Sequence, residues 1–258
     1  MTDKCPPVKE NKFLNNMKIN KILIVSAIVI IIFISNNLLA GETNIYNYTA
    51  ESIQYLMKPS GESEYNNLGM VDFKGLKANL ITLKTKVLFV EITEKIYSNP
   101  ENLLPYKTER ITKGLWINEY RTEEYDQEKF TVTIKKFEGK KLVKEKIIQS
   151  DCPIQNINLI IFYLREQPNL KIGWHFTAKV LDELKLFKFD LKLASIEEIA
   201  VPAGRFLAYH FISMPAKYEI WIDKSNPRIP LKIILKNILD CSILMKKYNL
   251  KLGVQDER

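Results

Sequence analysis

Apolar and polar residues alternate along much of this chain, and this alternation restricts the fold more than any other feature. The pattern is clearest over residues 130–135, 172–180, 187–193 and 229–236. Successive side chains of a β-strand point to opposite faces of its sheet, so each segment is expected to be a strand with one apolar face. The sequence therefore predicts a mainly β protein built on a single antiparallel sheet with at least one buried face.

Short turn signals separate these segments at intervals of roughly ten to fifteen residues. They are Pro59-Ser60-Gly61, Phe73-Lys74-Gly75, Glu138-Gly139-Lys140 and Asn226-Pro227. Strands joined by short turns form a meander, so the expected fold is a curved sheet, either a barrel or a half-barrel. Residues 77–97 are too long for one flat strand and are expected to form either one bent strand or two.

One segment, at about residues 150–167, has helical periodicity instead. Ser150 or Asp151 can cap its start, Pro153 suits a first turn, and Pro168 ends it. Its apolar residues recur at helical spacing, at Ile157, Ile160, Ile161 and Leu164. We expect one helix there, packed by this apolar stripe on the concave side of the sheet.

Residues 18–41 have the pattern of a secretory signal. Lys18 and Lys21 precede a run of 13 residues, 22–34, that is apolar apart from Ser26 and is shorter than the roughly 20 residues that span a bilayer. We expect cleavage after Ala40 or Gly41 and export to the periplasm or cell envelope. The alternative is an uncleaved helix that anchors the protein in the inner membrane, with its domain outside the cytoplasm.

The exit of this segment bears on anchoring and on domain boundaries. Glu42 stands where a lipoprotein signal needs a cysteine, so no lipid anchor is expected. Residues 1–40 are predicted to be an N-terminal extension with the signal peptide or anchor, starting at Met1 or Met17. Residues 41–258 are predicted to be a single β-rich domain.

Charge argues against a nucleic-acid partner. The net charge of +8 falls to +5 without the five lysines and two acidic residues of residues 1–40. The remaining charges are spread among apolar residues, which is typical of a solvated sheet face. The exported part contains Cys152 and Cys241, which are candidates for a disulfide in an oxidising compartment.

Nothing in the sequence amounts to a catalytic signature, so a non-catalytic protein without cofactor or metal is expected. His175 and His210 lie on predicted strands and have no partners at metal-ligand spacing. A hydrolase with dispersed residues would need a polar cluster around one of them. Adjacent acids such as Glu197 and Glu198 point to opposite sides of a strand and cannot act together.

Large apolar residues crowd the C-terminal half. The candidates for lining an apolar ligand site are Trp174, Phe176, Phe189, Phe206, Tyr218 and Trp221. Where both faces of a strand are apolar, one face can pack under the helix. The other face either fills a barrel core, lines a cavity or meets a partner.

Three residues have predicted structural roles. Gly204 supplies positive φ in the Pro202-Ala203-Gly204 turn. Pro230 lacks an N–H donor and suits an edge strand or a barrel mouth. Arg165, at the end of the helix, either pairs with Asp126 or Asp223 or caps helix carbonyls.

Three groups of segments, in this order and spacing, resemble the bacterial exported family called "domain of unknown function 3108". They are residues 98–106 with 119–120 and 125–126; residue 151 with 163–165 and 173; and residues 201–206 with 218–223 and 227–233. The resemblance implies a β-rich envelope protein of undetermined activity and offers no catalytic residues to carry over.

Together these features favour an exported protein that binds an apolar or amphipathic, lipid-like ligand in a curved sheet. The alternative is an envelope scaffold or assembly protein that binds a protein partner. Membrane contact is expected only through the N-terminal segment, and only if that segment is not cleaved.

Overall fold

The computed structural model describes residues 50–251, except 59, 183, 215–216 and 237–240. The predicted signal segment, both candidate start methionines and the turn residue Pro59 lie outside the described residues. Within the described ranges, no helix is long and apolar enough to cross a membrane.

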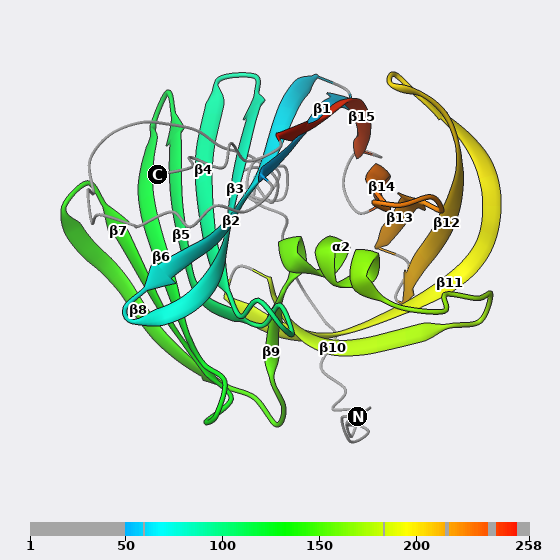
Figure 1. Ribbon diagram of the computed structural model, residues 1–258. Coiled ribbons are helices and arrows are strands. Elements are labelled where there is room, and N and C mark those ends of the chain that lie inside the picture. Colours follow the sequence, from blue (N-terminus) through cyan, green and yellow to red (C-terminus); the bar gives the residue numbers. More distant parts are fainter. Residues whose placement is uncertain (1–49, 59, 183, 215–216, 237–240, 252–258) are drawn as a thin grey trace, which may run out of the picture.

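The described residues form one strongly curved sheet with a single helix on its concave side (Figure 1). In chain order the elements are β1 (Ala50–Lys58), β2 (Gly61–Phe73), β3 (Leu76–Val87), β4 (Val90–Ser98), β5 (Pro105–Gly114), β6 (Ile117–Asp126), β7 (Thr131–Glu138), β8 (Lys141–Gln149), β9 (Ile154–Asn156), α2 (Ile157–Glu166), β10 (His175–Asp182), β11 (Lys185–Val201), β12 (Gly204–Met214), β13 (Tyr218–Asp223), β14 (Pro230–Leu235) and β15 (Cys241–Lys251). The predicted mainly β fold, with one curved sheet and one helix, is confirmed.

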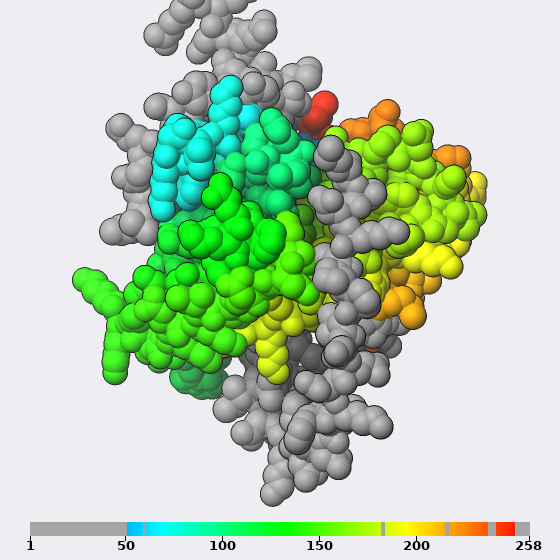
Figure 2. Space-filling model, turned by 90° about the horizontal axis from the view of Figure 1, so that it is seen from below, coloured from blue at the N-terminus to red at the C-terminus, as the bar shows by residue number. Residues whose placement is uncertain are grey.

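The sheet is made of two meanders, which are joined in the middle of the sheet through the first strand, β1, and the last strand, β15. Strands β1 to β8 follow one another across one half, and β10 to β15 follow one another across the other. The halves join where β1 pairs antiparallel with β15, from Ala50 opposite Lys251 to Lys58 opposite Ser242. Seen from below, the blue-to-green strands and the yellow-to-orange strands therefore lie on opposite sides of the molecule (Figure 2).

The sheet does not close into a barrel through its backbone, because β8 and β9 are its two edge strands. Side chains bridge the gap between the first meander, mainly β5 to β7, and the strands β9 and β10. Gln127 donates to the carbonyls of Pro105 at 3.1 Å and Ile154 at 2.8 Å, and its own carbonyl accepts from the Ile154 N–H at 3.0 Å. A small apolar cluster including Tyr125, Val132 and Leu181 packs across the same gap. We call this contact the seam.

The helix is shorter than predicted. It begins at Ile157, where the side chain of Asn156 accepts from the Asn158 N–H at 2.8 Å, and it ends at Glu166. Ser150 and Asp151 do not cap it. The intervening residues Ile154–Asn156 instead form β9, because their backbone pairs in parallel with β10.

Several other predictions are refined by the strand pairing. Residues 77–97 form two strands, β3 and β4, joined by a two-residue turn at Leu88-Phe89. Pro230 does not lie on an edge strand, because β14 is paired on both sides. It is the first residue of β14 and lies beside a register shift in β13, where its missing donor is tolerated.

The candidate disulfide between Cys152 and Cys241 is not formed. Cys152 precedes β9 at one edge of the sheet, whereas Cys241 begins β15 in the middle of it, and the two are not bonded to each other. Disulfide geometry needs Cα atoms within roughly 7 Å. The intervening strands β10 to β14 hold these two cysteines on separate parts of the sheet.

Candidate ligand site on the concave face

The concave face of the sheet is divided into two zones of different chemistry. The apolar zone comes from the C-terminal meander, with inward side chains that include Ala178, Phe189, Leu191, Leu193, Phe211 and Ile220. The polar zone comes from β4 to β6, with inward side chains Glu94, Thr108, Arg110, Thr112, Arg121 and Glu123. Both zones are buried, so the interior of this protein is amphipathic.

A crevice lies between α2 and the sheet where the two zones meet. Its lining residues are Tyr55, Ser63, Tyr65, Leu83, Ile157, Asn158, Ile161, Tyr218, Ile220, Ile233, Leu235 and Ile243. Its volume is about 50 Å³, well below the roughly 300 Å³ at which small-molecule sites begin. Side chains therefore largely fill the space under α2 in this conformation.

The crevice has a polar end at β2 and β3. The hydroxyls of Ser63 and Thr85 are hydrogen-bonded to each other there. The side-chain amide nitrogen of Asn158 is buried and has no hydrogen-bond partner. An unpaired buried donor beside apolar walls suits an acceptor atom on an amphipathic ligand.

The polar zone adjoins this end directly, because Leu83 of the crevice is the cross-strand neighbour of Glu94. Arg110 donates to Glu94 Oε2 through Nε at 3.0 Å and Nη2 at 2.7 Å. Arg121 Nη2 lies 3.2 Å from Glu123 Oε1. Glu94 Oε1 and the Nε of Arg121 are buried without a partner. The zone is thus balanced in charge but incompletely hydrogen-bonded.

Three buried tyrosines supply neutral hydroxyls to this interior. Burial is the main cause that raises the pKa of Tyr55, Tyr65 and Tyr125 above the ordinary tyrosine value. Each hydroxyl therefore stays protonated and donates a hydrogen bond. Tyr65 donates to the carbonyl of Asn158 at 3.2 Å, which connects the polar end of the crevice to the start of α2.

The predicted aromatic candidates are split between the two faces of the sheet. Phe189 is fully buried in the apolar zone and packs edge-on against Tyr218, which lines the crevice. Trp174 and Phe176 stack on each other and contact Phe211 and Tyr163 respectively. All four belong to the concave side.

Trp221 and Phe206 lie on the convex face, away from the crevice. Trp221 alternates with Ile220 and stacks on the ring of His210, with centroids 4.1 Å apart. Phe206 shares the face of β12 that carries His210. Neither residue lines the crevice, and on the concave side Trp174, Phe176 and Phe189 do not line it either, so Tyr218 is the one predicted residue that does.

His210 has carboxylate and hydroxyl neighbours on the convex face. Its Nδ1 lies 3.2 Å from Ser195 Oγ, and its Nε2 lies 3.4 Å from Glu219 Oε2. Ser195 Oγ also lies 3.0 Å from Glu197 Oε2 and donates to it. A nucleophilic serine also needs a substrate cleft in front of its hydroxyl. Ser195, Glu197 and His210 line neither the crevice nor the larger hollow on the convex face. The other histidine, His175, is exposed on β10.

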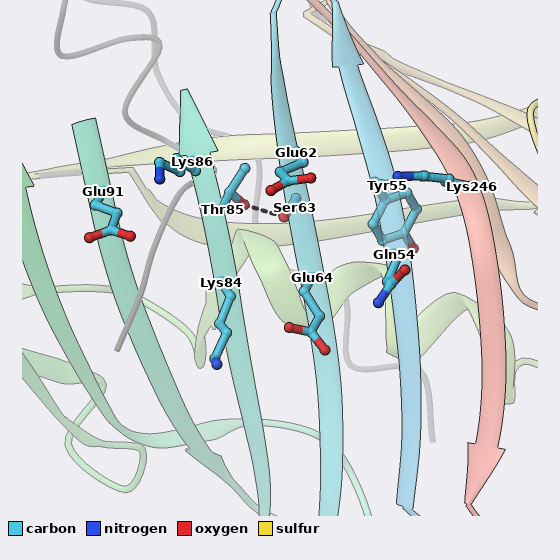
Figure 3. A pocket seen from close by; sticks show the side chains of 10 residues that line it. All are labelled: Gln54, Tyr55, Glu62, Ser63, Glu64, Lys84, Thr85, Lys86, Glu91 and Lys246. Atoms are coloured by element: carbon cyan, nitrogen blue, oxygen red, sulfur yellow. Dashed lines mark hydrogen bonds between the residues drawn. The ribbon is translucent and has the colours of Figure 1, made fainter. Parts of the chain in front are cut away.

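A larger hollow, of about 370 Å³, lies on the convex face over β1 to β4. Figure 3 views it from the side opposite α2, and its charged side chains project from the strands toward the viewer. Its ionisable lining consists of Tyr55, Glu62, Glu64, Lys84, Lys86, Glu91 and Lys246. Acidic and lysine side chains alternate in this hollow, and they are long and solvated. The hollow therefore has neither a fixed arrangement of groups nor a net charge that would select a ligand.

No cluster of His, Cys, Asp or Glu suited to hold a metal occurs among the described residues. The remaining predicted residues are structural. Arg165 pairs with Glu51, at 2.9 Å between Nη2 and Oε2, and not with Asp126 or Asp223. Gly204 has φ of 140° at the turn into β12.

The polar zone was not predicted from the sequence, because its inward residues are charged or carry hydroxyls and so do not stand out as an apolar alternation. Thr108, Arg110 and Thr112 also alternate with period two, as do Arg121, Glu123 and Tyr125. Arg121 and Glu123, opposite charges two residues apart on one strand, were the available signal.

These features define the class of protein as an incompletely closed antiparallel β-sheet whose amphipathic concave face is covered by one helix. The chain belongs to the family described as "Protein of unknown function (DUF3108)", whose model matches residues 78–237. This confirms the resemblance noted in the sequence.

A crystal structure of a β-barrel-like protein of the domain of unknown function DUF1849 from Brucella abortus is similar in part. The alignment covers 80% of this chain and 99% of that chain, with 7% sequence identity and a TM-score of 0.49. A comparison with curated proteins finds no match.

Proposed function

We propose that this protein is an exported, non-catalytic carrier that binds an amphipathic, lipid-like ligand on its concave face. The observation that carries the proposal is the crevice beneath α2, which has apolar walls and an unpaired amide donor at its polar end. The apolar part of the ligand lies between α2 and the apolar zone. Its polar group lies toward Asn158 and the hydroxyls of Ser63 and Thr85.

The proposal requires α2 to move, because the crevice is too small for an acyl chain while α2 is packed down. Contacts at the two ends of α2 differ in strength. Its last turn is held by the Arg165–Glu51 ion pair and by Arg228, which donates to the carbonyls of Arg165 and Gln167. Its first turn is held by neutral hydrogen bonds from Tyr65 and to Thr108. We propose that the first turn lifts and the last turn acts as the hinge.

The test is ligand recovery and uptake by the purified protein. Native mass spectrometry is expected to show co-purified lipid, and a fluorescent fatty acid is expected to bind saturably. Ile233→Trp adds bulk inside the crevice and should abolish uptake, whereas Ile172→Trp, on an exposed loop, should leave it intact. Protein that is repeatedly empty and takes up no probe would contradict the proposal.

Asn158→Ala separates the polar contact from the apolar one. We expect the affinity for a fatty acid to fall about five- to tenfold, as for the loss of one hydrogen bond. Affinity for an uncharged hydrocarbon probe should stay the same, because the apolar walls are unchanged. Equal effects on both probes would show that Asn158 does not contact the polar group.

The alternative, an envelope scaffold that binds a protein partner, is favoured by one feature. Strand β8 is an unpaired edge with Leu142, Val143 and Ile147 exposed. An extended segment of a partner could add to such an edge. Crosslinking from β8 in intact cells distinguishes the two functions, since a single dominant protein adduct supports the scaffold.

A further inference from the structure

Two neighbouring hairpin tips carry large apolar side chains into solvent. The turn between β3 and β4 consists of Leu88 and Phe89, which are 67% and 74% exposed. The turn between β5 and β6 consists of Leu115 and Trp116, which are 66% and 94% exposed. Large apolar residues normally lie in buried cores, and two-residue turns normally contain Asn, Asp or Gly.

The two tips form one protruding surface. Strands β4 and β5 are paired, with Glu91 opposite Lys113 just below the turns. A side chain placed at Gly114 would touch the carbonyl of Phe89 at 3.5 Å, so the turns themselves are adjacent. Figure 1 shows both at the upper rim of the sheet. We call these four apolar residues the rim tips.

Backbone strain at Leu88 indicates that the apolar side chain is not a neutral choice. Leu88 has φ of 53°, in the left-handed region that Gly and Asn adopt readily and that branched side chains avoid. Leu103 has a similar φ but is buried, whereas Leu88 is exposed, so the strained side chain at Leu88 has no packing role and is available for an interaction outside the folded chain.

Lysines surround the rim tips on the three hairpins of this edge. Lys86 and Lys113 flank the two apolar turns, and Lys140 and Lys141 occupy the next hairpin. The acids of these described hairpins are Glu138 and Glu91, and Glu91 is the cross-strand neighbour of both Lys86 and Lys113. Four lysines against two acids leave a modest positive surplus along this edge. Exposed aromatic side chains on an edge with surplus lysines fit the interface of a bilayer with anionic lipid, where the rings enter the headgroup region and the ammonium groups meet phosphates.

We propose that the rim tips dock the protein onto the surface of an anionic phospholipid bilayer by inserting Phe89 and Trp116. A protruding pair of turns suits a deformable lipid surface better than a protein surface, which pairs with broad complementary patches. This contact is additional to any made by the N-terminal segment. It does not depend on the proposed carrier function.

The test uses the full chain, so its readout must not depend on the N-terminal segment. Vesicles of phosphatidylcholine and anionic phosphatidylglycerol, containing a brominated lipid, should quench part of the tryptophan emission. Trp116→Phe should remove that quenching, because Trp174 and Trp221 lie within the folded sheet. Quenching that is equal in both proteins would overturn the proposal.

Variants then separate insertion from folding. Phe89→Ser and Trp116→Ser should each weaken vesicle binding about tenfold, as expected for one buried aromatic side chain. Leu88→Asn should weaken binding while raising the melting temperature, because asparagine accepts the left-handed conformation. Leu76→Ser, at the opposite end of β3 and 52% exposed, is the control and should leave binding unchanged.

Charge and partner class provide two further outcomes. Lys86→Gln with Lys113→Gln should reduce binding to vesicles with phosphatidylglycerol and not to phosphatidylcholine alone. Binding that ignores lipid charge would refute the role of the lysines. A specific protein crosslinked at position 116, together with no lipid quenching, would refute membrane docking.

Discussion

Arg165 is the residue that fastens the helix to the sheet. Its guanidinium makes two hydrogen bonds to the buried carboxylate of Glu51 on β1, and Tyr248 of β15 donates to the same carboxylate at 3.2 Å. One ion pair therefore joins α2 to the two strands where the halves of the sheet meet. Its burial means that solvent screens it only weakly.

Removing one partner of this pair should be strongly destabilising. Arg165→Met leaves the Glu51 charge buried without its cation, so we expect a loss of about 3–5 kcal/mol in the free energy of unfolding. The measurement is urea denaturation. The double variant Arg165→Met with Glu51→Leu should recover much of the loss, because an apolar pair needs no compensation. Lys129→Met, which removes an exposed pair with Asp126, is the control and should change little.

Glu219 makes the stability depend on pH. Burial acts to raise its pKa, but the hydrogen bond and charge of Lys236, with His210, outweigh burial and hold the pKa below the ordinary value of 4.5. The charged form therefore stabilises the fold above pH 4.5, and this contribution is lost as the pH falls through the lower folded-state pKa.

We expect Glu219→Gln to flatten the acid side of the stability profile. Melting temperatures measured on descending pH through this range should fall less steeply than for the unaltered protein. Glu62→Gln, an exposed residue of the convex face, is the matched control and should reproduce the unaltered slope. An unchanged slope for Glu219→Gln would contradict the assignment.

At the scale of elements, the seam differs from the rest of the sheet. Side-chain contacts hold the seam together, whereas backbone hydrogen bonds between paired strands hold the rest of the sheet. Gln127 alone satisfies three backbone groups there, the carbonyl of Pro105 on its own side and the carbonyl and N–H of Ile154 on the other. Gln127→Ala should cost about 2–4 kcal/mol, because those groups lose their partner in a half-buried site. Hydrogen exchange at Ile154 should accelerate. Gln149→Ala removes two exposed hydrogen bonds and should stay within about 0.5 kcal/mol.

The elements also show how far the sequence predicts this structure. Strands of the C-terminal meander were predictable because their inward residues are apolar, as in Phe187–Leu193. Strands β5 and β6 gave no such signal, since Arg110, Arg121 and Glu123 occupy their inward positions. The start of α2 was misplaced because Ser150 and Pro153 are local signals, whereas β9 forms through pairing with β10.

Of the six aromatic residues predicted to line a ligand site, only Tyr218 lines the crevice. Trp174, Phe176, Phe189 and Tyr218 do lie on the concave side, because strand alternation decides their face. Asn158 and Ser63 were not predictable, since only the packing of α2 across β2 and β3 brings these residues together. Which side of β13 faces the helix likewise depends on the curvature of the whole sheet, and this placed Trp221 outside the crevice.

At the scale of the whole molecule, the two meanders should unfold as one unit. The β1–β15 pairing runs the length of both strands, and the large apolar core includes residues of both halves, such as Ile53 and Phe211. Native-state hydrogen exchange should therefore give the same opening free energy for central β3–β4 and β12–β13 amides. Two distinct values would mean that the halves are separate cooperative units.

The β1–β15 pairing also has a consequence for how the chain is made. Glu51 and Tyr248, which meet across this pair, are 197 residues apart in the sequence. On the ribosome, β1 emerges early. The edge of β1 that pairs with β15 has no partner until almost the whole chain has been translated. Hairpins such as β3–β4 can form at once, but the central join is the last to be completed, so the nascent chain spends its synthesis with an open strand edge exposed to other chains.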